Sequence, residues 1–322
     1  YMAIRRPMKT PEVGTEVFNS LLITGNGANR TVTGVGFPPD LFHSKARNVG
    51  FANAFFDRLR GAKQILIPNS TAIENTDATS VTGFDVQDGI SLGLDNIGSA
   101  SVNYPGGYNY VEHFFKRAKG FFDVVAYTGD GAGTRVLNHN LSASPELIIG
   151  KSRSSVVNWW AWSSHTPSNQ GYLYLDATNA ILGGATTYVT PTADDFTINV
   201  SGTIWNGSST NYIAYLFATL AGVSKVGSYT GNGSNQTIDC GFSTGARFIL
   251  IKRTDLAGDW YYWDSVRGIV AGNDPHLSLN TVAAEVTTDD SVDPDSSGFI
   301  VNQVAATNIN VSAGSYIFYS IA

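Results

Sequence analysis

Apolar residues along this chain come in short runs, separated by clusters of Gly, Asn, Ser and Pro. Several runs alternate with polar residues at every second position, as in Thr237-Ile-Asp-Cys240. Short runs rich in β-branched and aromatic side chains, bounded by turn residues, are typical of β-strands. A helical period is not sustained, and Ala52–Leu59 is the only weak candidate for a helix. The pattern therefore predicts an all-β fold.

The stretch Ser228–Gly233, Ser-Tyr-Thr-Gly-Asn-Gly, has two earlier counterparts in the chain, Thr24–Gly27 and Thr128–Gly131. The copies lie about 100 residues apart, which is the signature of a tandem repeat. Asn-Gly and Asp-Gly between alternating strands favour a two-residue hairpin with a type I′ turn. We therefore expect each copy to open a repeat with a β-hairpin.

Each repeat shows the same order of strand signals. After the hairpin comes an apolar strand ending in lysine, then an aromatic strand, a glycine/phenylalanine strand and a final strand that begins with tyrosine. The strands ending in lysine are Leu41–Lys45, Leu147–Lys151 and Phe248–Lys252. Many short strands in about 100 residues indicate a β-sandwich of the jelly-roll or lectin-like kind. The predicted modules are residues 17–120, 121–221 and 222–322.

The first residues look like the end of a repeat. Tyr1–Arg6 matches the final tyrosine strands, such as Tyr316–Ile321. We expect residues 1–16 to supply the last strand of an upstream module, followed by a linker that contains Pro7 and Pro11.

One position of the aromatic strand is a large ring in every repeat. Counted from the shared lysine, it is Phe56, Trp162 or Trp263. Rings of this size dominate the burial of protein cores. We predict that all three are core residues of their modules.

Neighbouring residues on a strand point to opposite faces, so the rings beside these positions are predicted to face away from the module core. They are Phe55, Trp159, Trp260 and Tyr262. Two interpretations stay open for them. Outward rings on a polar module mark an interface between repeats or subunits, or they form a platform on which a sugar stacks.

Two repeats carry an aspartate and an arginine just after the aromatic strand, Asp57 with Arg60 and Asp264 with Arg267. The second repeat has a Ser-Ser-His stretch there, beginning at Ser163. We interpret each Asp–Arg pair as an ion pair that holds a loop.

Composition argues against several classes of function. The net charge is −6, only 14% of residues are charged, and Lys and Arg do not cluster, so nucleic acid is not an expected partner. The chain has one cysteine, Cys240, so no disulfide can form within it. It lacks an apolar run long enough for a membrane-spanning helix, and membrane insertion is not expected.

The sequence predicts no enzyme activity, no cofactor and no metal site. The glycine-containing turns are not followed by a helix pattern, and the five histidines are scattered. Asp293–Gly298 starts like a calcium loop but has Val304, not glutamate, at the twelfth position. Whether the loop Asp289–Asp295 binds calcium is left open.

Several motifs of the third repeat together resemble a module found in tandem in bacteriophage structural proteins, especially those of marine and cyanobacterial phages. They are Lys225–Ser234, Gly241-Phe242, Ile251–Asp255, Trp260, Asp264-Ser265, Gly298-Phe299 and Ser312–Phe318, with Gly36–Leu41 and Ala3–Pro7 as further stretches. The resemblance covers nearly the whole chain. It implies a virion protein, made in the cytoplasm of the bacterial host and located in the tail or on the surface of the virion.

The resemblance further implies a non-enzymatic tail fibre or receptor-binding protein that acts in host attachment. Its expected partners are itself, as a homotrimer, other virion tail proteins, and a host cell-surface glycan or protein. Two alternatives stay open. A structural spacer or capsid decoration protein would bury the outward rings between subunits. A glycan depolymerase would need two carboxylates facing one groove, about 5–10 Å apart.

Overall fold

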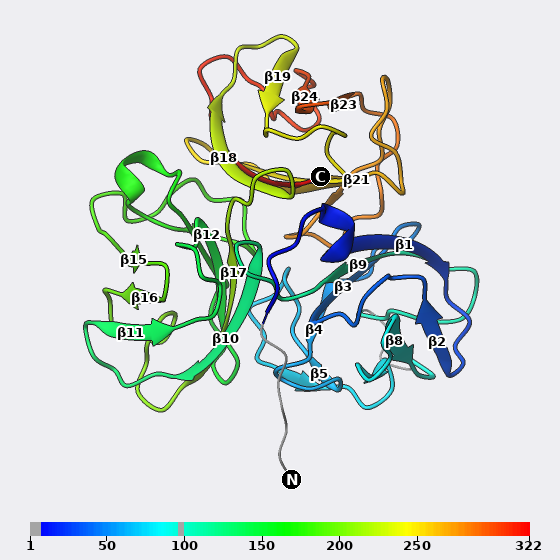
Figure 1. Ribbon diagram of the computed structural model, residues 1–322, viewed down its shortest axis with the longest axis horizontal. Helices are drawn as coiled ribbons and strands as arrows, with labels where there is room; N and C mark the ends of the chain where they lie inside the picture. The colour runs from blue at the N-terminus through cyan, green and yellow to red at the C-terminus, as the bar shows by residue number, and fades with distance from the viewer. Residues whose placement is uncertain (1–7, 96–99) are drawn as a thin grey trace.

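β-Strands make up the architecture of the described chain, which comprises residues 8–95 and 100–322 of a computed structural model (Figure 1). Its helical segments are two 3₁₀ turns, η1 (Gly14–Glu16) and η2 (Pro167–Asn169). The weak helix candidate Ala52–Leu59 contains strand β4 instead. The all-β prediction is confirmed, and the predicted strand Tyr1–Arg6 lies outside the described residues.

Each module has a larger inner sheet with antiparallel pairing. In sheet order, the inner strands of module 1 are β1 (Phe18–Thr24), β9 (Asn109–Phe115), β3 (Leu41–Ala46) and β4 (Ala54–Asp57). Those of module 2 are β10 (Phe122–Thr128), β17 (Asn211–Phe217), β12 (Leu147–Ser152), β13 (Trp160–Ser163) and β14 (Leu173–Tyr174). Those of module 3 are β18 (Ser224–Thr230), β25 (Ser315–Ile321), β20 (Phe248–Arg253), β21 (Trp260–Asp264) and β22 (Leu277–Ser278).

A three-stranded outer sheet completes each sandwich. The outer strands are β2 (Arg30–Thr33), β8 (Gly89–Leu92) and β7 (Val81–Gly83) in module 1. They are β11 (Arg135–Asn138), β16 (Asp195–Ile198) and β15 (Val189–Pro191) in module 2, and β19 (Gln236–Asp239), β24 (Gly298–Val301) and β23 (Val292–Asp295) in module 3. Module 1 also has the short pair β5 (Gln64–Ile65) and β6 (Asn75–Thr76). The predicted fold class, three tandem β-sandwiches, is confirmed.

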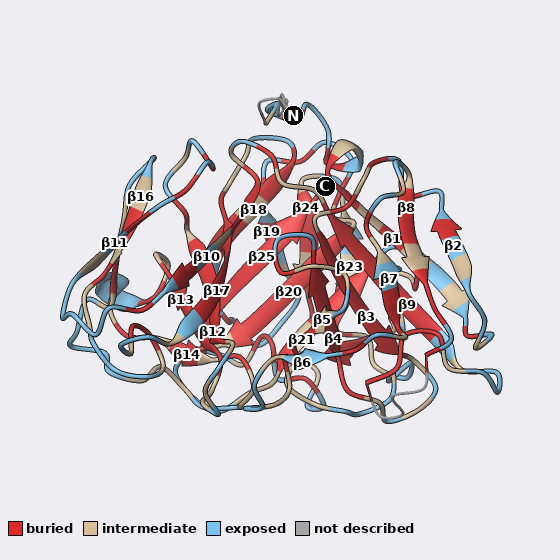
Figure 2. Cartoon of the chain, turned by 90° about the horizontal axis from the view of Figure 1, so that it is seen from below, coloured by how far each residue is buried: buried red, intermediate tan, exposed pale blue. Residues whose placement is uncertain are grey.

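The three inner sheets surround one centre, and each turns a face towards it (Figure 1). One continuous cluster of buried apolar side chains fills this centre and includes Leu41, Ile149 and Leu250, one from each module. We call this cluster the shared core. Figure 2 shows the inner strands as largely buried and the loops around them as largely exposed. The modules therefore form one body and are not independent units on a string.

The opposite face of each inner sheet packs against its own outer sheet and forms a separate module core. Phe56, Trp162 and Trp263 lie in these three module cores, with 0%, 1% and 0% of their surface exposed. The prediction that they are core residues is confirmed.

The two ends of the molecule differ. Strand β9 ends level with the starts of β1 and β3, so the chain leaves module 1 at the end where these strands begin. Strands β17 and β25 finish at the corresponding place in modules 2 and 3. Gly14 packs against Ala322 there, since a Cβ atom on Gly14 would lie 2.0 Å from the Ala322 carbonyl oxygen. We call this the junction end and the opposite one the loop end; Figure 2 shows the C-terminus on the junction side.

The turn Thr24–Gly27 and its two counterparts lie at the loop end, but the predicted hairpins are wrong. The turns connect β1 with β2, β10 with β11 and β18 with β19, and each pair is divided between two sheets. A type I′ turn needs φ > 0 at both central residues, whereas Gly27 (φ +62°) is the only residue of its turn with a positive φ. The N–H groups of Gly25 and Gly27 donate to the carbonyls of Tyr108 and Asn103 (2.8 and 2.7 Å). The turn is therefore a corner that carries the chain from the inner to the outer sheet.

Trp162→Ala should lower the free energy of unfolding by about 3–5 kcal/mol, because a large ring is removed from a packed core and a cavity remains. Because the modules share a core, we expect this loss in a single cooperative transition of the whole chain, measured by urea denaturation with circular dichroism. Val156→Ala, at a side chain that is 71% exposed, is the control and should change stability by less than about 0.5 kcal/mol. Separate transitions, one of them unchanged by Trp162→Ala, would contradict the shared core.

Candidate functional site

The four rings predicted to face away from their module cores all lie in the shared core. Phe55, Trp159, Trp260 and Tyr262 expose 7%, 0%, 1% and 0% of their surface. The neighbouring modules of the same chain cover them. As a result, these four rings are not available to a sugar, and they no longer argue for association between chains.

Two of these rings also connect modules by hydrogen bonds. Trp159 Nε1 donates to the Ile67 carbonyl of module 1 (3.0 Å). Trp260 Nε1 donates in the same way to the Tyr174 carbonyl of module 2 (2.8 Å). In both cases a module donates from its aromatic strand to the backbone of the module before it.

Module 1 has an asparagine, Asn53, at the corresponding position. Its Nδ2 donates to the carbonyls of Ser278, Leu279 and Thr281 of module 3, each at 3.1 Å. The three links therefore close a ring in which every module donates to one neighbour and accepts from the other. This ring fixes the direction in which the modules follow one another around the centre.

The lysines at the ends of the apolar strands form a second ring of contacts. Lys45, Lys151 and Lys252 are fully buried, and none of the ion pairs among the described residues involves them. Each ammonium donates to one or two backbone carbonyls of its own module and to one of the neighbouring module. The neighbouring acceptors are Val282 for Lys45, Thr71 for Lys151 and Thr178 for Lys252, at 3.1, 3.0 and 2.9 Å. Burial lowers the pKa of all three lysines to about 8.

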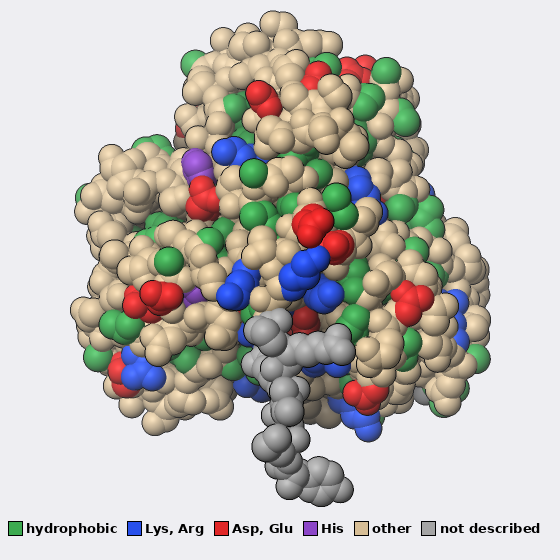
Figure 3. Space-filling model, viewed as in Figure 1, with side chains coloured by type: hydrophobic (Ala, Val, Ile, Leu, Met, Phe, Trp, Pro, Cys, Tyr) green, Lys and Arg blue, Asp and Glu red, His purple; other side chains and the backbone are tan. Residues whose placement is uncertain are grey.

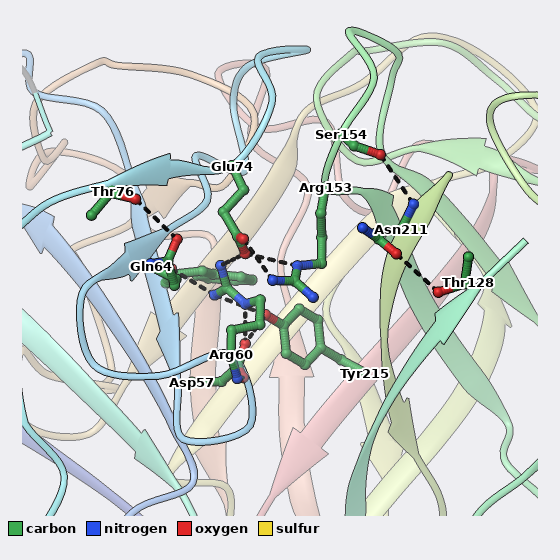
Figure 4. A network of polar contacts seen from close by, with 11 residues as sticks. Asp57, Arg60, Gln64, Glu74, Thr76, Thr128, Arg153, Ser154, Asn211 and Tyr215 are labelled. Atoms are coloured by element: carbon green, nitrogen blue, oxygen red, sulfur yellow. Dashed lines mark hydrogen bonds and ion pairs between the residues drawn. The ribbon is translucent and has the colours of Figure 1, made fainter. Parts of the chain in front are cut away.

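Charged side chains cross the boundary between modules 1 and 2 (Figure 4). Arg60 pairs with Asp57 of its own loop and, through Nη1, with Glu74 (3.1 Å). Arg153 of module 2 binds the same Glu74 with Nη2 and Nε (2.7 and 2.9 Å). The hydroxyl of Tyr215 in module 2 donates to Asp57 (2.8 Å). The ion pair Asp57–Arg60, expected from the sequence to hold a loop, is thus also part of a contact between modules 1 and 2.

The boundary between modules 3 and 1 repeats this arrangement. Arg267 pairs with Asp264 (2.6 Å) and Glu285 (3.3 Å), and Arg47 of module 1 binds Glu285 (2.8 Å). His113 of module 1 takes the place of the tyrosine and contacts Asp264 through Nε2 (2.9 Å). Burial would raise the pKa of the Asp264 carboxyl, but Arg267 and His113 outweigh it and hold this pKa well below its usual range.

Polar contacts continue from this boundary into the shared core. The Nδ1 atoms of His113 and His43 lie 3.1 Å apart, and His43 Nε2 lies 2.9 Å from Asn53 Oδ1. Burial lowers the pKa of both imidazoles. A line of polar contacts therefore joins the Asp264 ion pair to the Asn53 link between modules.

The boundary between modules 2 and 3 lacks the charged set. Ser163, Thr166, Ile181 and Thr254 occupy the corresponding positions. The backbone link is kept, because the Ile181 N–H donates to the Thr254 carbonyl (2.9 Å), as the equivalent groups do at the other two boundaries. The four charged positions of this contact have thus been exchanged together.

Tyr319 shows the consequence of that exchange. It corresponds to Tyr215 and His113, but its buried hydroxyl has no hydrogen-bond partner among the described residues. A cavity of about 10 Å³, lined by Ser163 and Tyr319 among others, lies beside it. This is the space of about one water molecule, and it lies beside Ser163, which stands where the other boundaries have an aspartate.

The loop Asp289–Asp295 uses its carboxylates within the fold. Asn302 Nδ2 donates to Asp290 (2.7 Å) and Asp293 (3.0 Å), and Asp295 accepts from the backbone and side chain of Ser297 (2.8 and 2.7 Å). In the part of the chain that the structure describes, no group of three or more potential metal ligands is found. Residues 292–295 of this stretch are strand β23, which pairs with β24, and Asp295 begins the hydrogen-bonded turn between the two strands.

Three partly exposed rings at the loop end of module 1 were not singled out from the sequence. Phe51, Tyr104 and Tyr108 lie with ring centres 5.1–6.4 Å apart. We call them the aromatic patch. The available signal was the loop Asn103–Asn109, whose two inner tyrosines have no counterpart in the Asn/Ser/Gly loops of the other repeats.

Fold and boundaries define a class of protein: a single chain whose three similar β-sandwiches form a ring around a shared core. A family model described as a domain of unknown function (DUF7483) matches residues 13–322, and the chain belongs to this family. The match runs through all three modules as one unit. Among curated proteins, none matches the chain. Across the described residues, no helix has the length and apolar character needed to cross a membrane.

Asp264→Asn should lower the free energy of unfolding by about 3–5 kcal/mol, because the buried guanidinium of Arg267 loses the closer of its two carboxylate partners and keeps only Glu285. The matched control is Ser163→Ala at the equivalent position of module 2, which should cost about 1 kcal/mol or less. Urea denaturation of the three proteins measures both values. Similar losses in the two variants would show that the boundary charges do not stabilise the ring.

Lys151→Met tests the buried ammonium groups. The pKa of Lys151 is about 8 in the folded chain and about 10.4 in an unfolded chain. Between these values the unfolded chain binds more protons, so this lysine makes stability rise with pH. The variant lacks that titration, and its three carbonyl acceptors lose their donor, at a cost of about 1–3 kcal/mol near neutral pH.

We therefore expect the stability difference between wild type and Lys151→Met to widen as pH rises above about 8. Urea denaturation at several pH values between 7 and 9 gives this difference. Lys119→Met, at an exposed lysine, is the control for loss of a lysine charge outside the core. A constant difference for Lys151→Met would mean that its pKa is not lowered.

Proposed function

We propose that the chain is a non-enzymatic protein of a bacteriophage virion and acts in host attachment, as part of a tail fibre or receptor-binding protein. The virion assignment is supported by the resemblance of the repeat motifs, such as Lys225–Ser234 and Ser312–Phe318, to tandem modules of phage structural proteins. The attachment role is supported by one structural observation, the difference between the two ends of the molecule.

At the junction end, Gly14 and Ala322 are in contact. A chain that continued beyond either residue would leave from that end, and the loop end would point away from it. The loops there are rich in Asn, Ser, Gly and Tyr, side chains that make adaptable contacts with a partner. The shared core beneath them holds the loops on a rigid scaffold, which favours binding because little order is lost.

The state of the carboxylates supports a non-enzymatic role. Asp57, Glu74, Asp264 and Glu285 meet closely at the module boundaries, but arginines bind all four. A glycan depolymerase needs two carboxylates that face one groove, with one of them free to donate a proton. The boundary carboxylates do not meet this requirement.

The charge pattern fits a partner other than nucleic acid. On the face of the molecule seen in Figure 3, basic and acidic side chains lie side by side. Two partly exposed pairs illustrate the mixture of charges on the molecular surface: Arg58 contacts Asp40 (3.3 Å), and Arg135 contacts Asp130 (2.7 Å). A surface of this kind does not form the continuous basic path that phosphate binding requires.

The rival role of a structural spacer is less well supported. A spacer transmits the chain from one end to the other, whereas residues 14 and 322 meet at the same end. The rings that a spacer would bury between subunits are buried within one chain. The expected homotrimer rests on the resemblance alone, and sedimentation of the purified chain decides between a 34.4 kDa monomer and a trimer.

Binding to whole cells tests the attachment role. Fluorescently labelled protein, incubated with a panel of marine bacteria including cyanobacteria, should bind some strains and not others, and unlabelled protein should compete. Heat-denatured protein is the control for non-specific adhesion. Absence of strain-selective binding, together with detection of the protein on the capsid of purified virions, would favour a decoration protein instead.

A further inference from the structure

We propose that the aromatic patch of Phe51, Tyr104 and Tyr108 is a binding site for a neutral saccharide. The inference deepens the proposed attachment function and rests on it, since it names the chemical class of the receptor. It is carried by the geometry of the rings, by a comparison among the three modules and by the absence of charged residues from the two loops that form the site.

The three rings form a corner at the loop end. Phe51 and Tyr104 are nearly perpendicular, with an interplanar angle of 89° and ring centres 6.4 Å apart. Tyr108 lies between them, 5.1 Å from Phe51 and 5.9 Å from Tyr104. All three are partly exposed. A pyranose ring is a chair whose axial C–H groups form an apolar face, so one aromatic ring can stack on this face while a second meets the edge of the sugar.

Phe51 occupies a backbone position that all three modules share. Its carbonyl accepts from Lys45 (2.7 Å), just as the carbonyls of Val157 and Gly258 accept from the equivalent lysines. Since the other modules make this contact with an aliphatic side chain or none, the backbone link does not require the Phe51 ring.

The same comparison holds for the two tyrosines. The carbonyl of Tyr108 accepts from the N–H of Gly25, in the turn Thr24–Gly27. The carbonyls of Thr210 and Gly314 accept in the same way from the equivalent turns of modules 2 and 3. The N–H of Tyr104 donates to a tyrosine hydroxyl, as do those of Gly207 and Val311. Three aromatic residues of module 1 thus stand where modules 2 and 3 have small or aliphatic ones. Modules 2 and 3 adopt the same fold without these rings. We therefore assign the rings of module 1 to ligand binding.

The loops of the patch carry no charge. Residues 48–53 and 103–109 contain no Asp, Glu, Lys or Arg. The hydroxyls of Tyr104 and Tyr108 take part in none of the hydrogen bonds within the described chain, and they are free to donate to and accept from a ligand. An uncharged site with exposed rings and free hydroxyls matches a neutral sugar better than an acidic glycan or a phosphate.

The loop that carries the tyrosines is shaped before a ligand arrives. Gly106 (φ +110°) and Gly107 (φ +82°) adopt backbone conformations that other residues rarely enter. Asn48 holds the loop from the neighbouring strand connection, because its Nδ2 donates to the Gly107 carbonyl (3.1 Å) and its Oδ1 accepts from the Asn109 N–H (3.0 Å). A site formed in advance loses less conformational freedom on binding.

A printed array of neutral and anionic oligosaccharides, followed by calorimetry with the best neutral ligand, tests the site. Tyr104→Ala and Tyr108→Ala should each weaken binding by about tenfold or more, a loss of about 1.4 kcal/mol for each tenfold step. Thr210→Ala, at the position of module 2 that corresponds to Tyr108, should bind as the wild type does. Circular dichroism and urea denaturation check that all variants fold.

The Phe substitutions separate stacking from hydrogen bonding. Tyr108→Phe should keep most of the affinity if the ring supplies the contact, and Tyr104→Phe serves the same comparison for the second ring. The proposal is overturned if the array shows binding to anionic glycans alone, or if the Tyr104→Ala/Tyr108→Ala double variant binds the neutral ligand as tightly as the wild type.

Cell binding distinguishes this inference from the proposed function. If the double variant binds cells as the wild type does, the saccharide site is wrong while the attachment role stands. If the wild type binds neither cells nor any glycan of the array, both fail. If it binds a neutral glycan through the patch but no cells, the site stands and the attachment role fails.

Discussion

The structure depends on a single constraint: each inner sheet has two apolar faces, and its own outer sheet covers only one of them. In module 2, for example, the face that the outer sheet leaves uncovered presents Trp159, Leu147 and Ile149. Exposed to water, such a face would be unfavourable at roughly 25 cal/mol for each Å² of apolar surface. Three such faces turned towards one centre bury one another. The modules are therefore complete only as a set of three, and the family model accordingly spans the three as one unit.

Burying these faces also buries polar groups, and their hydrogen bonds give the ring its order. An indole N–H or an ammonium group withdrawn from water needs a partner. In each case the partner is a backbone carbonyl of one particular neighbour, as with Trp159 and Ile67 or Lys151 and Thr71. Apolar packing has little direction, whereas these contacts can form with the modules in one order only. The hydrophobic effect thus brings the modules together, and the buried polar groups determine how they are arranged.

Local patterns of the sequence predicted what is local in the structure. Strand positions, the three repeats and the two faces of the aromatic strand follow from alternation and from counting residues after the shared lysine, as Phe56 and Phe55 illustrate. The turn at Thr24–Gly27 was predicted wrongly, because the residue types of a hairpin turn also suit a corner between sheets.

What covers the outward rings could not be predicted, since it depends on how whole modules pack. The charged contact between modules is reflected in correlated substitutions among the repeats, which are not visible when each repeat is considered by itself. Where Asp57 and Arg60 become Ser163 and Thr166, Glu74 also becomes Ile181. Residues distant in the sequence change as a set, because a buried charge left without its partner is more costly than none. Comparing such sets across the repeats, position by position, would have indicated contact between modules.

The single-chain ring also permits its modules to diverge at the loop end. In a trimer of identical chains, every substitution appears three times, and a loop must suit three positions at once. Here the positions that hold the core are kept in all modules, whereas the loops differ, with rings in Asn103–Asn109 and small residues in Asn206–Asn211. A ligand that approaches along the axis of such a ring meets three different surfaces. One module can then carry the binding site while the other two supply the shared core that holds its loops in place.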